Sequence, residues 1–561
     1  MILFKRLLSI AISLGILHST TDIFSNLLAY EINFMEIPYS NPDDEKFNVE
    51  EFKTYLDNSK AELINSGDFK QAKNVIDKSN QSINEMKTNL YLLQHKYFID
   101  NNDIVTLCQF NDLSSQIYEA EKYLYSFITD ISGWESFTEI KNMYTSHVFD
   151  DDFLQTQTNL INDYYSNKEF NKLSEIYIQL INLRKNSADS DNYADTVLKR
   201  IYKNDYSIND LIKIKEQIKD LLLYISKYDI DYYSLYESIE TTSGEALNEF
   251  EKSLSDTSEE YHAIYTSATK NNLFRTIDES ECTSIGAITS YLYKYNESLS
   301  TIIYSSKKSD KLNVIDEFGK YINRYYKAEN YESKNETELL ICNMFQILLN
   351  DDKLLYITKL TNDLQQAYIV TSFEIYAYTE DNISPEKLSK KYYEIKKEIG
   401  YSYPDLQNTD DSWVCIEDIF TLPLSSSISI SSILNSLQYW NITDKSQSLA
   451  ILNNFLKASP SSKTIELLKE NNMKSCFDSD NLSASIESFK SIIDNSFSET
   501  GINKKGDVNI DGIINASDIL TLKKYLLKHN DFSDFSHKNA DINSDDSINI
   551  FDLKRLKDMI M

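Results

Sequence analysis

Two twelve-residue stretches near the C-terminus repeat one pattern: DVNIDGIINASD at 507–518 and DINSDDSINIFD at 541–552. Both place Asp or Asn at positions 1, 3, 5, 9 and 12, and an apolar residue at position 8. An acidic, Asn-rich tail could match such a pattern once by chance, but a repeat of the whole pattern favours a specific role. The repeat predicts two cation-binding loops of the same design.

Calcium accounts for the residue types in the repeat. This ion binds six to eight oxygen ligands, which a twelve-residue loop supplies from positions 1, 3, 5, 7, 9 and 12 around a sharp turn at position 6. Gly512 fills the turn position of the first copy and Asp546 that of the second, and both residue types tolerate positive φ better than most. The predicted ligands are Asp507, Asn509, Asp511, the carbonyl of Ile513, Asn515 and Asp518 in the first copy, and Asp541, Asn543, Asp545, the carbonyl of Ser547, Asn549 and Asp552 in the second.

Each loop is followed by a helical pattern, but neither is preceded by the first helix of a full EF-hand. This combination resembles a type I dockerin, the module that attaches secreted bacterial proteins to cellulosome scaffolds. The resemblance implies two bound Ca²⁺ ions, a cohesin domain of a scaffoldin as the partner, and a secreted, extracellular, cellulosome-associated protein. In this family, loop positions 10 and 11 and basic residues of the next helix face the cohesin. The corresponding residues here are Ala516, Ser517, Lys523, Lys524, Ile550, Phe551 and Lys557.

The two copies differ at these partner-facing positions. Dockerins that repeat nearly the same pair in both copies can dock in two orientations, but here Ala516 and Ser517 correspond to Ile550 and Phe551. A single docking mode is therefore expected. The Ile550–Phe551 pair is either buried against the cohesin or packed inside the tail.

Turn-forming residues are scarce in the chain as a whole. Its 561 residues include only 10 Gly and 6 Pro, where average usage would give about 40 and 28. This composition favours long helices joined by short polar loops, and so predicts an all-α fold. The net charge of −31 argues against nucleic-acid binding, which needs a basic surface. The five cysteines show neither metal-ligand spacing nor a disulfide framework.

The N-terminus has the features of a secretion signal. Lys5 and Arg6 precede an apolar run at 7–17, which is too short to anchor the chain in a bilayer. A buried N-terminal helix is the alternative. No later segment approaches twenty apolar residues, so we expect no membrane span in the mature chain. The expected division is a signal peptide at 1–29, a helical body at 30–493, a linker at 494–505 and a dockerin at 506–561.

Helical periodicity runs through the body. Apolar residues recur at three- and four-residue spacing, which is typical of amphipathic helices. Ser384 and Pro385 form a favourable helix start, because a capping side chain is followed by Pro at the first helical position. The clearest helical patterns lie at 89–99, 115–128, 211–225, 337–349, 353–378, 385–399 and 485–493.

Part of the body resembles a known helical family. Residues 359–400 read KLTNDLQQAYIVTSFEIYAYTEDNISPEKLSKKYYEIKKEIG, and FLKASPSSKTIELLKENN follows at 455–472. These segments and their order are similar to the C-terminal part of oligoendopeptidase F-type zinc metallopeptidases, and the N-terminal half is similar in a vaguer way. The resemblance implies a large two-lobed helical body of metallopeptidase-like architecture.

The zinc-binding signature of that family is degenerate in this chain. The signature is H-E-x-x-H, in which two histidines bind zinc and the glutamate activates a metal-bound water. At the corresponding place Glu317 is present, but the two ligand positions hold Asp316 and Lys320. A lysine ammonium cannot bind zinc and repels it. We therefore expect no catalytic residues and no zinc in the body.

Two other parts of the family's site also differ. Leu339, beside Glu338, aligns with the glutamate that serves the family as third zinc ligand. Residues 413–424 align with a stretch in which the family has His and Tyr, and contain neither. No shifted alignment restores the signature, because no two of the six histidines are four residues apart.

Two classes of function remain open. The first is a non-catalytic peptidase-like body that binds a peptide or a polysaccharide-associated ligand within a polysaccharide-degrading complex. The second is an active hydrolase, either a helical-barrel glycoside hydrolase, which needs two carboxylates, or a peptidase with atypical metal ligands. The chain has only three Trp residues, few for a sugar-binding surface, which favours the first class.

Overall fold

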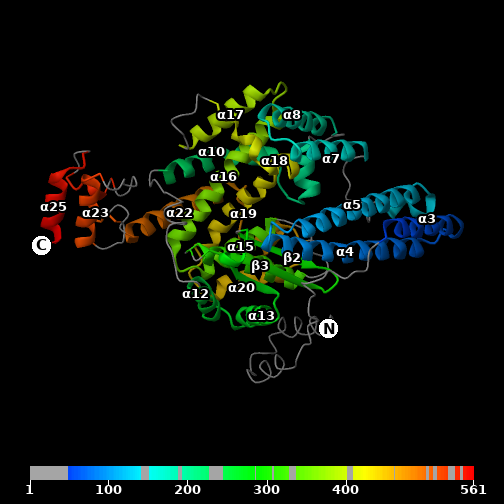
Figure 1. Ribbon diagram of the computed structural model, residues 1–561, viewed down its shortest axis with the longest axis horizontal. Coiled ribbons are helices and arrows are strands. Elements are labelled where there is room, and N and C mark those ends of the chain that lie inside the picture. The colour runs from blue at the N-terminus through cyan, green and yellow to red at the C-terminus, as the bar shows by residue number, and fades with distance from the viewer. Residues whose placement is uncertain are drawn as a thin grey trace, which may run out of the picture. The chain divides into compact units, whose positions relative to one another are not determined.

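Most of the helical body and part of the tail are described by the computed structural model (Figure 1). The predicted signal peptide lies outside the described residues. Within the described part, no helix is both long enough and apolar enough to cross a membrane. The described residues are 48–140, 151–187, 193–226, 244–284, 286–305, 307, 309–327, 336–400, 409–459, 462–500, 505–509, 514–528, 537, 539–543 and 547–560.

The first three described helices pack on one another side by side: α3 (Val49–Ser66), α4 (Phe69–Ile99) and α5 (Ile104–Ser132) (Figure 1). Gly67 ends α3 in the left-handed conformation, at φ 60°, which Gly adopts without strain. Asp68 then caps α4 by accepting the first backbone N–H groups. The two caps let the chain reverse within two residues. Buried apolar side chains of this unit include Leu56, Leu63, Ile76, Ile83, Leu124 and Phe127.

A small sheet follows the helices α12 (Glu245–Ser255) and α13 (Glu259–Lys270). β3 lies in its centre, parallel to β1 and antiparallel to β2. The prediction of an all-α fold is confirmed for the rest of the described chain, but it missed this sheet. The missed segment is rich in Thr, Ile and Tyr, which favour strands. The strands are β1 (Phe274–Asp278), β2 (Gly286–Leu292) and β3 (Glu297–Tyr304).

Two helices, α14 and α15, pack closely on each other, and α14 also packs against β2 and β3. Around them the remaining helices build the larger part of the body (Figure 1). Its longer helices are α7 (Asp151–Tyr165), α8 (Phe170–Asn186), α10 (Ile208–Ser226), α14 (Asp310–Lys327), α15 (Glu336–Leu349), α16 (Lys353–Thr379), α17 (Pro385–Glu398), α19 (Ser425–Tyr439), α20 (Lys445–Lys457) and α22 (Ser479–Thr500), and the short ones include α9 (Tyr193–Thr196), α18 (Glu417–Thr421) and α21 (Thr464–Glu470).

The helical patterns recognised in the sequence are confirmed. Six lie within helices of the structure, and the seventh, at 385–399, extends one residue past α17, which ends at Glu398. The Ser384 side chain caps α17 by accepting the Lys387 N–H at 3.3 Å. One boundary differs from expectation. Helix α22 continues to Thr500, so the first residues of the expected linker at 494–505 are helical.

A buried arginine holds the stretch 413–424 in the largest described core. Arg184 donates to the carbonyl groups of Ile419 and Phe420, at 3.0 and 2.5 Å. On the same stretch, the Leu424 N–H donates to the Glu374 carboxyl at 2.9 Å. Trp413 is fully buried among apolar side chains of α8, α16 and α17. This stretch therefore serves packing in the described structure.

Glu374 is fully buried, and burial raises its pKa to about 8. In the unfolded chain a Glu carboxyl has a pKa near its ordinary 4.5. Between these values the folded protein keeps a proton that the unfolded chain releases. Stability contributed by this proton is therefore present at low pH and is lost as pH rises towards 8.

We expect Glu374→Gln to flatten this pH dependence, because the amide stays neutral at every pH. The wild-type free energy of unfolding should fall by up to about 1.4 kcal/mol per pH unit between about pH 5 and 8 from this group alone. Denaturant unfolding followed by Trp fluorescence measures the difference. The exposed Glu470→Gln is the matched control. If Glu374→Gln retains the wild-type slope, Glu374 is ionised in the folded protein.

Candidate functional site

The last residue of each predicted calcium loop holds its own loop closed. The Asp518 carboxylate accepts the N–H groups of Val508 and Asn509 with one oxygen, at 2.7 and 3.1 Å, and that of Asn515 with the other, at 2.8 Å. Asp552 repeats the arrangement with the N–H groups of Ile542, Asn543 and Asn549, at 2.9, 3.2 and 2.9 Å. The two copies therefore share a local geometry as well as a sequence pattern.

A common core joins the two repeats. Helices α23 (Ala516–Leu526) and α25 (Ile550–Ile560) pack on each other through Leu522, Leu553 and Leu556. Between the copies, the Asn539 side chain donates to the Asp507 carbonyl at 2.7 Å and the Asn539 carbonyl accepts the Gly506 N–H at 2.9 Å. The repeats thus form one small unit with a shared interior.

The described ligands suit a calcium ion. Asp518 and Asp552 are fully buried, and within the described part of the chain neither forms an ion pair with a Lys, Arg or His. Three neutral N–H groups leave each carboxylate with a net charge and with capacity for one more partner, because a carboxylate offers about four acceptor sites. A buried carboxylate is costly unless its charge is compensated. A hard cation in the loop supplies that compensation.

Not all predicted ligands can be placed. Asp511, Ile513 and Asp545 lie outside the described residues. Among the described side chains, no three His, Cys, Asp or Glu residues come together as a metal site. Predicted ligands that are described are Asp507, Asn509, Asn515, Asp518, Asp541, Asn543, Ser547, Asn549 and Asp552.

The predicted partner-facing pair of the second copy is exposed. Ile550 is 64 % exposed and Phe551 66 %, which rules out packing of the pair inside the tail. The equivalent residues of the first copy, Ala516 and Ser517, are also exposed. Lys523 and Lys524 are exposed on α23, whereas Lys557 is half-buried on α25.

In the body, the predicted motif position on α14 is occupied by an internal ion pair. The Lys320 ammonium lies 2.5 Å from a Glu317 oxygen, and the Thr289 hydroxyl donates to the other oxygen. Burial acts to lower the pKa of Lys320, but the charges around it, first that of Glu317, raise the pKa above its ordinary value. Lys320 is therefore a permanent cation beside the only glutamate that the motif retains.

Asp316 is neutralised in the same way. The Lys359 ammonium bridges Asp316 and Asp363, at 3.1 and 2.6 Å. The Gln346 amide also donates to Asp316, at 2.7 Å. Both residues at the histidine positions of the motif are thus engaged in contacts within the protein.

A second ion pair joins α14 to α15. Arg324 lies 3.3 Å from Glu338, and the Asn323 amide donates to the same carboxylate at 3.2 Å. Glu338 is buried, whereas Leu339 is half-buried. The residue that α15 presents to α14 is therefore Glu338, one position before the residue that the sequence alignment placed there.

These contacts make a poor zinc site. Zinc needs three or four neutral imidazole, thiolate or carboxylate ligands around one point. Here Lys320, Arg324 and Lys359 already contact the carboxylates of Glu317, Glu338 and Asp316. A divalent ion would have to displace these cations and remain next to them. The residues present do not fit zinc.

One serine–histidine contact escaped sequence reasoning, because its partners lie far apart in the chain. His95 on α4 contacts Thr301 through Nδ1 at 2.8 Å and Ser290 through Nε2 at 3.1 Å. Arg275 donates to the Thr301 hydroxyl at 2.9 Å. Each ring nitrogen of His95 is thus paired with one hydroxyl of the sheet.

The imidazole of His95 is neutral in this setting. Burial, with Arg275 and Arg324 nearby, lowers the pKa of His95 to about 3. The imidazole is therefore neutral at physiological pH. His95 joins α4 to the sheet through these two hydroxyl contacts.

The tail matches a known family. Residues 505–561 match the family model of the type I dockerin domain. The tail is a type I dockerin. Such a domain indicates calcium binding and a cohesin partner, and marks the chain as a cellulosome component.

The body matches solved structures in fold. A structure described as an oligoendopeptidase F superposes with a TM-score of 0.64 at 13 % identity, covering 82 % of this chain and 99 % of the other. PZ peptidase A gives 0.61 at 14 % identity, covering 81 % and 99 %. A third structure, described as an oligoendopeptidase F from Bacillus anthracis str. Ames, gives 0.58 at 15 %, covering 81 % and 98 %. No curated protein matches the sequence. The predicted fold resemblance is confirmed, and at these identities it concerns the fold alone.

We expect Asp518→Ala and Asp552→Ala each to remove one of two calcium ions. Each change deletes a ligand and also leaves three loop N–H groups without their acceptor. Calorimetric titration of the full chain with calcium counts the sites. Asp558→Asn, an exposed acid on α25, is the control and should retain both. Two sites of wild-type affinity in either Ala variant would refute the ligand assignment.

Proposed function

We propose that this chain is a secreted cellulosome component whose helical body is not a catalyst. The dockerin, loaded with two calcium ions, attaches it to a scaffoldin cohesin. The body has a peptidase-like fold and serves a binding or accessory role in a polysaccharide-degrading complex. The division proposed is a signal peptide at 1–29, a body from 30, and a dockerin from about 506 onward.

The observation that carries the non-catalytic assignment is the contact of Lys320 with Glu317. In an H-E-x-x-H peptidase the glutamate must be free to take a proton from a metal-bound water. Here a lysine ammonium, fixed on the same helix one turn later, pairs with that carboxylate. Thr289 donates to its other oxygen. Both oxygens of that carboxylate are therefore engaged in contacts within the protein.

The two partner-facing surfaces of the dockerin are chemically different, which supports a single docking mode. Large exposed apolar side chains are strong anchors in protein interfaces. The second copy offers Ile550 and Phe551, whereas the first offers only Ala516 and Ser517. Binding through the second copy would bury the side chains of Ile550 and Phe551. Binding through the first copy would leave both in water.

We expect Ile550→Ala combined with Phe551→Ala to weaken cohesin binding by about tenfold to a hundredfold or more, the usual effect of truncating anchor residues. Retention on a panel of immobilised type I cohesins, with and without a calcium chelator, measures it. Ser517→Ala is the matched control in the first copy and should bind normally. Unchanged binding by the double variant would mean that the first copy can replace the second.

The zinc content of the purified protein tests whether the body is a metallopeptidase. After exhaustive dialysis, mass spectrometry of the purified protein should find far less than one zinc per chain. The variant Asp316→His with Lys320→His restores two ligands beside Glu317 and removes one repelling charge, so it should bind more zinc than the wild type. Asp316→His alone is the control.

About one zinc per wild-type chain would overturn the proposal and direct attention to peptide cleavage. Release of reducing sugar from xylan, cellulose or pectin would overturn it in favour of a glycoside hydrolase. Either activity should be measured on the full, calcium-loaded chain, so that loss of the dockerin does not confuse the result.

A further inference from the structure

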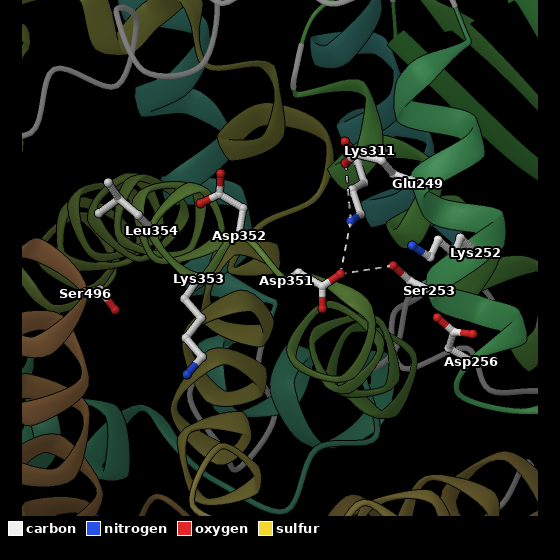
Figure 2. Close-up of a pocket in the computed structure, with 10 residues that line it drawn as sticks. All are labelled: Glu249, Lys252, Ser253, Asp256, Lys311, Asp351, Asp352, Lys353, Leu354 and Ser496. Carbon is white, nitrogen blue, oxygen red and sulfur yellow. Dashed lines mark hydrogen bonds and ion pairs between the residues drawn. The ribbon is translucent and has the colours of Figure 1, made fainter. Parts of the chain in front are cut away.

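A cavity of about 850 Å³ opens in the body between α12, the start of α14, the α15–α16 connection and α22 (Figure 2). Its volume lies in the range of small-molecule sites. None of its lining residues takes part in the ion pairs at the degenerate motif or belongs to the dockerin. The function proposed above makes no use of it.

A buried lysine forms part of the cavity wall. Lys311 is only 6 % exposed, and Figure 2 shows its ammonium directed between the carboxylates of Glu249 and Asp351. The two distances are 3.6 and 4.0 Å, longer than a hydrogen bond. Among the described residues, none accepts a hydrogen bond from Lys311. An ammonium has three N–H donors, so Lys311 keeps donors for a closer acceptor in the cavity.

The carboxylates near Lys311 are free to move. The side chains of Glu249 and Asp351 are 58 % and 93 % exposed, and exposed ion pairs at such distances contribute little. Besides its long contact with Lys311, the Asp351 carboxylate accepts a 3.5 Å contact from the Ser253 hydroxyl. An anionic group entering the cavity can therefore reach Lys311 and release Asp351 for a different partner.

The remaining wall selects the ligand class. Four carboxylates and three ammonium groups line the cavity, with Leu354 as the apolar contribution. The excess of carboxylates disfavours phosphates and nucleotides. None of the lining residues is aromatic, so the cavity wall has no ring on which a sugar stacks. A ligand that carries one negative and one positive group matches both kinds of charge.

We propose that this cavity binds a small zwitterion, a free amino acid or a short peptide. The ligand carboxylate accepts hydrogen bonds from Lys311, and its ammonium group donates to Asp351 and to Asp256, an exposed acid on the same side of the cavity (Figure 2). The long Lys311–Asp351 contact is thereby exchanged for shorter contacts to the ligand. This proposal stands independently of the non-catalytic assignment.

Calorimetric titration of the full, calcium-loaded protein with glycylglycine tests the proposal. The wild type should bind, and Lys311→Met should weaken binding by about tenfold or more, the effect of losing one charge-assisted hydrogen bond. Its melting temperature should change little, because the methionine keeps the length of the side chain and removes only two long ion pairs to exposed carboxylates. Lys390→Met, an exposed lysine of α17, is the control and should bind as the wild type does.

A second variant tests the other end of the ligand and cannot disturb the core. Asp256→Asn should weaken glycylglycine and leave N-acetylglycine, which lacks the ammonium group, unaffected. If Lys311→Met proves unstable, the binding of the two ligands by Asp256→Asn and by the wild type tests the proposal instead. The proposal is overturned if the wild type shows no binding at any soluble concentration, if Lys311→Met retains wild-type affinity, or if N-acetylglycine binds as tightly as glycylglycine.

Discussion

A buried carboxylate must have its charge compensated, and much of this molecule is arranged around that requirement. Three solutions occur in one chain. In the dockerin, Asp518 and Asp552 bind loop N–H groups and are predicted calcium ligands. On α14, ammonium and guanidinium groups of the protein contact Glu317 and Glu338. In the largest core, burial raises the pKa of Glu374 to about 8, so a proton neutralises it.

These solutions respond to different conditions. Calcium dissociates when its concentration falls, so the fold of the dockerin depends on the medium. Lysine and arginine are covalently attached and remain charged, so the packing around α14 needs no external ion. We therefore expect loss of calcium to weaken docking and to leave the interior of the body unchanged.

The sequence predicted what depends on local pattern. Helices such as α16 and α17 follow from apolar periodicity and from the cap at Ser384, and the calcium loops follow from residue types at fixed positions. Contacts between distant segments were not accessible in this way. The pairing of β1 with β3 and the contact of His95 with Thr301 join segments whose proximity only the folded chain creates. The choice between Glu338 and Leu339 depends on helix rotation, since one residue turns a side chain by about 100°.

Close packing of α14 on α15 is a second constraint on the body. A Cβ atom at Gly319 would lie 3.0 Å from the Cys342 Sγ and 3.1 Å from its Cα, so any larger residue would push α15 away. The same approach brings Glu338 to Arg324. A glycine contact and a salt bridge thus hold the two helices together in this chain. Both contacts depend on helix packing and on residues of the chain itself, and neither needs a bound ion.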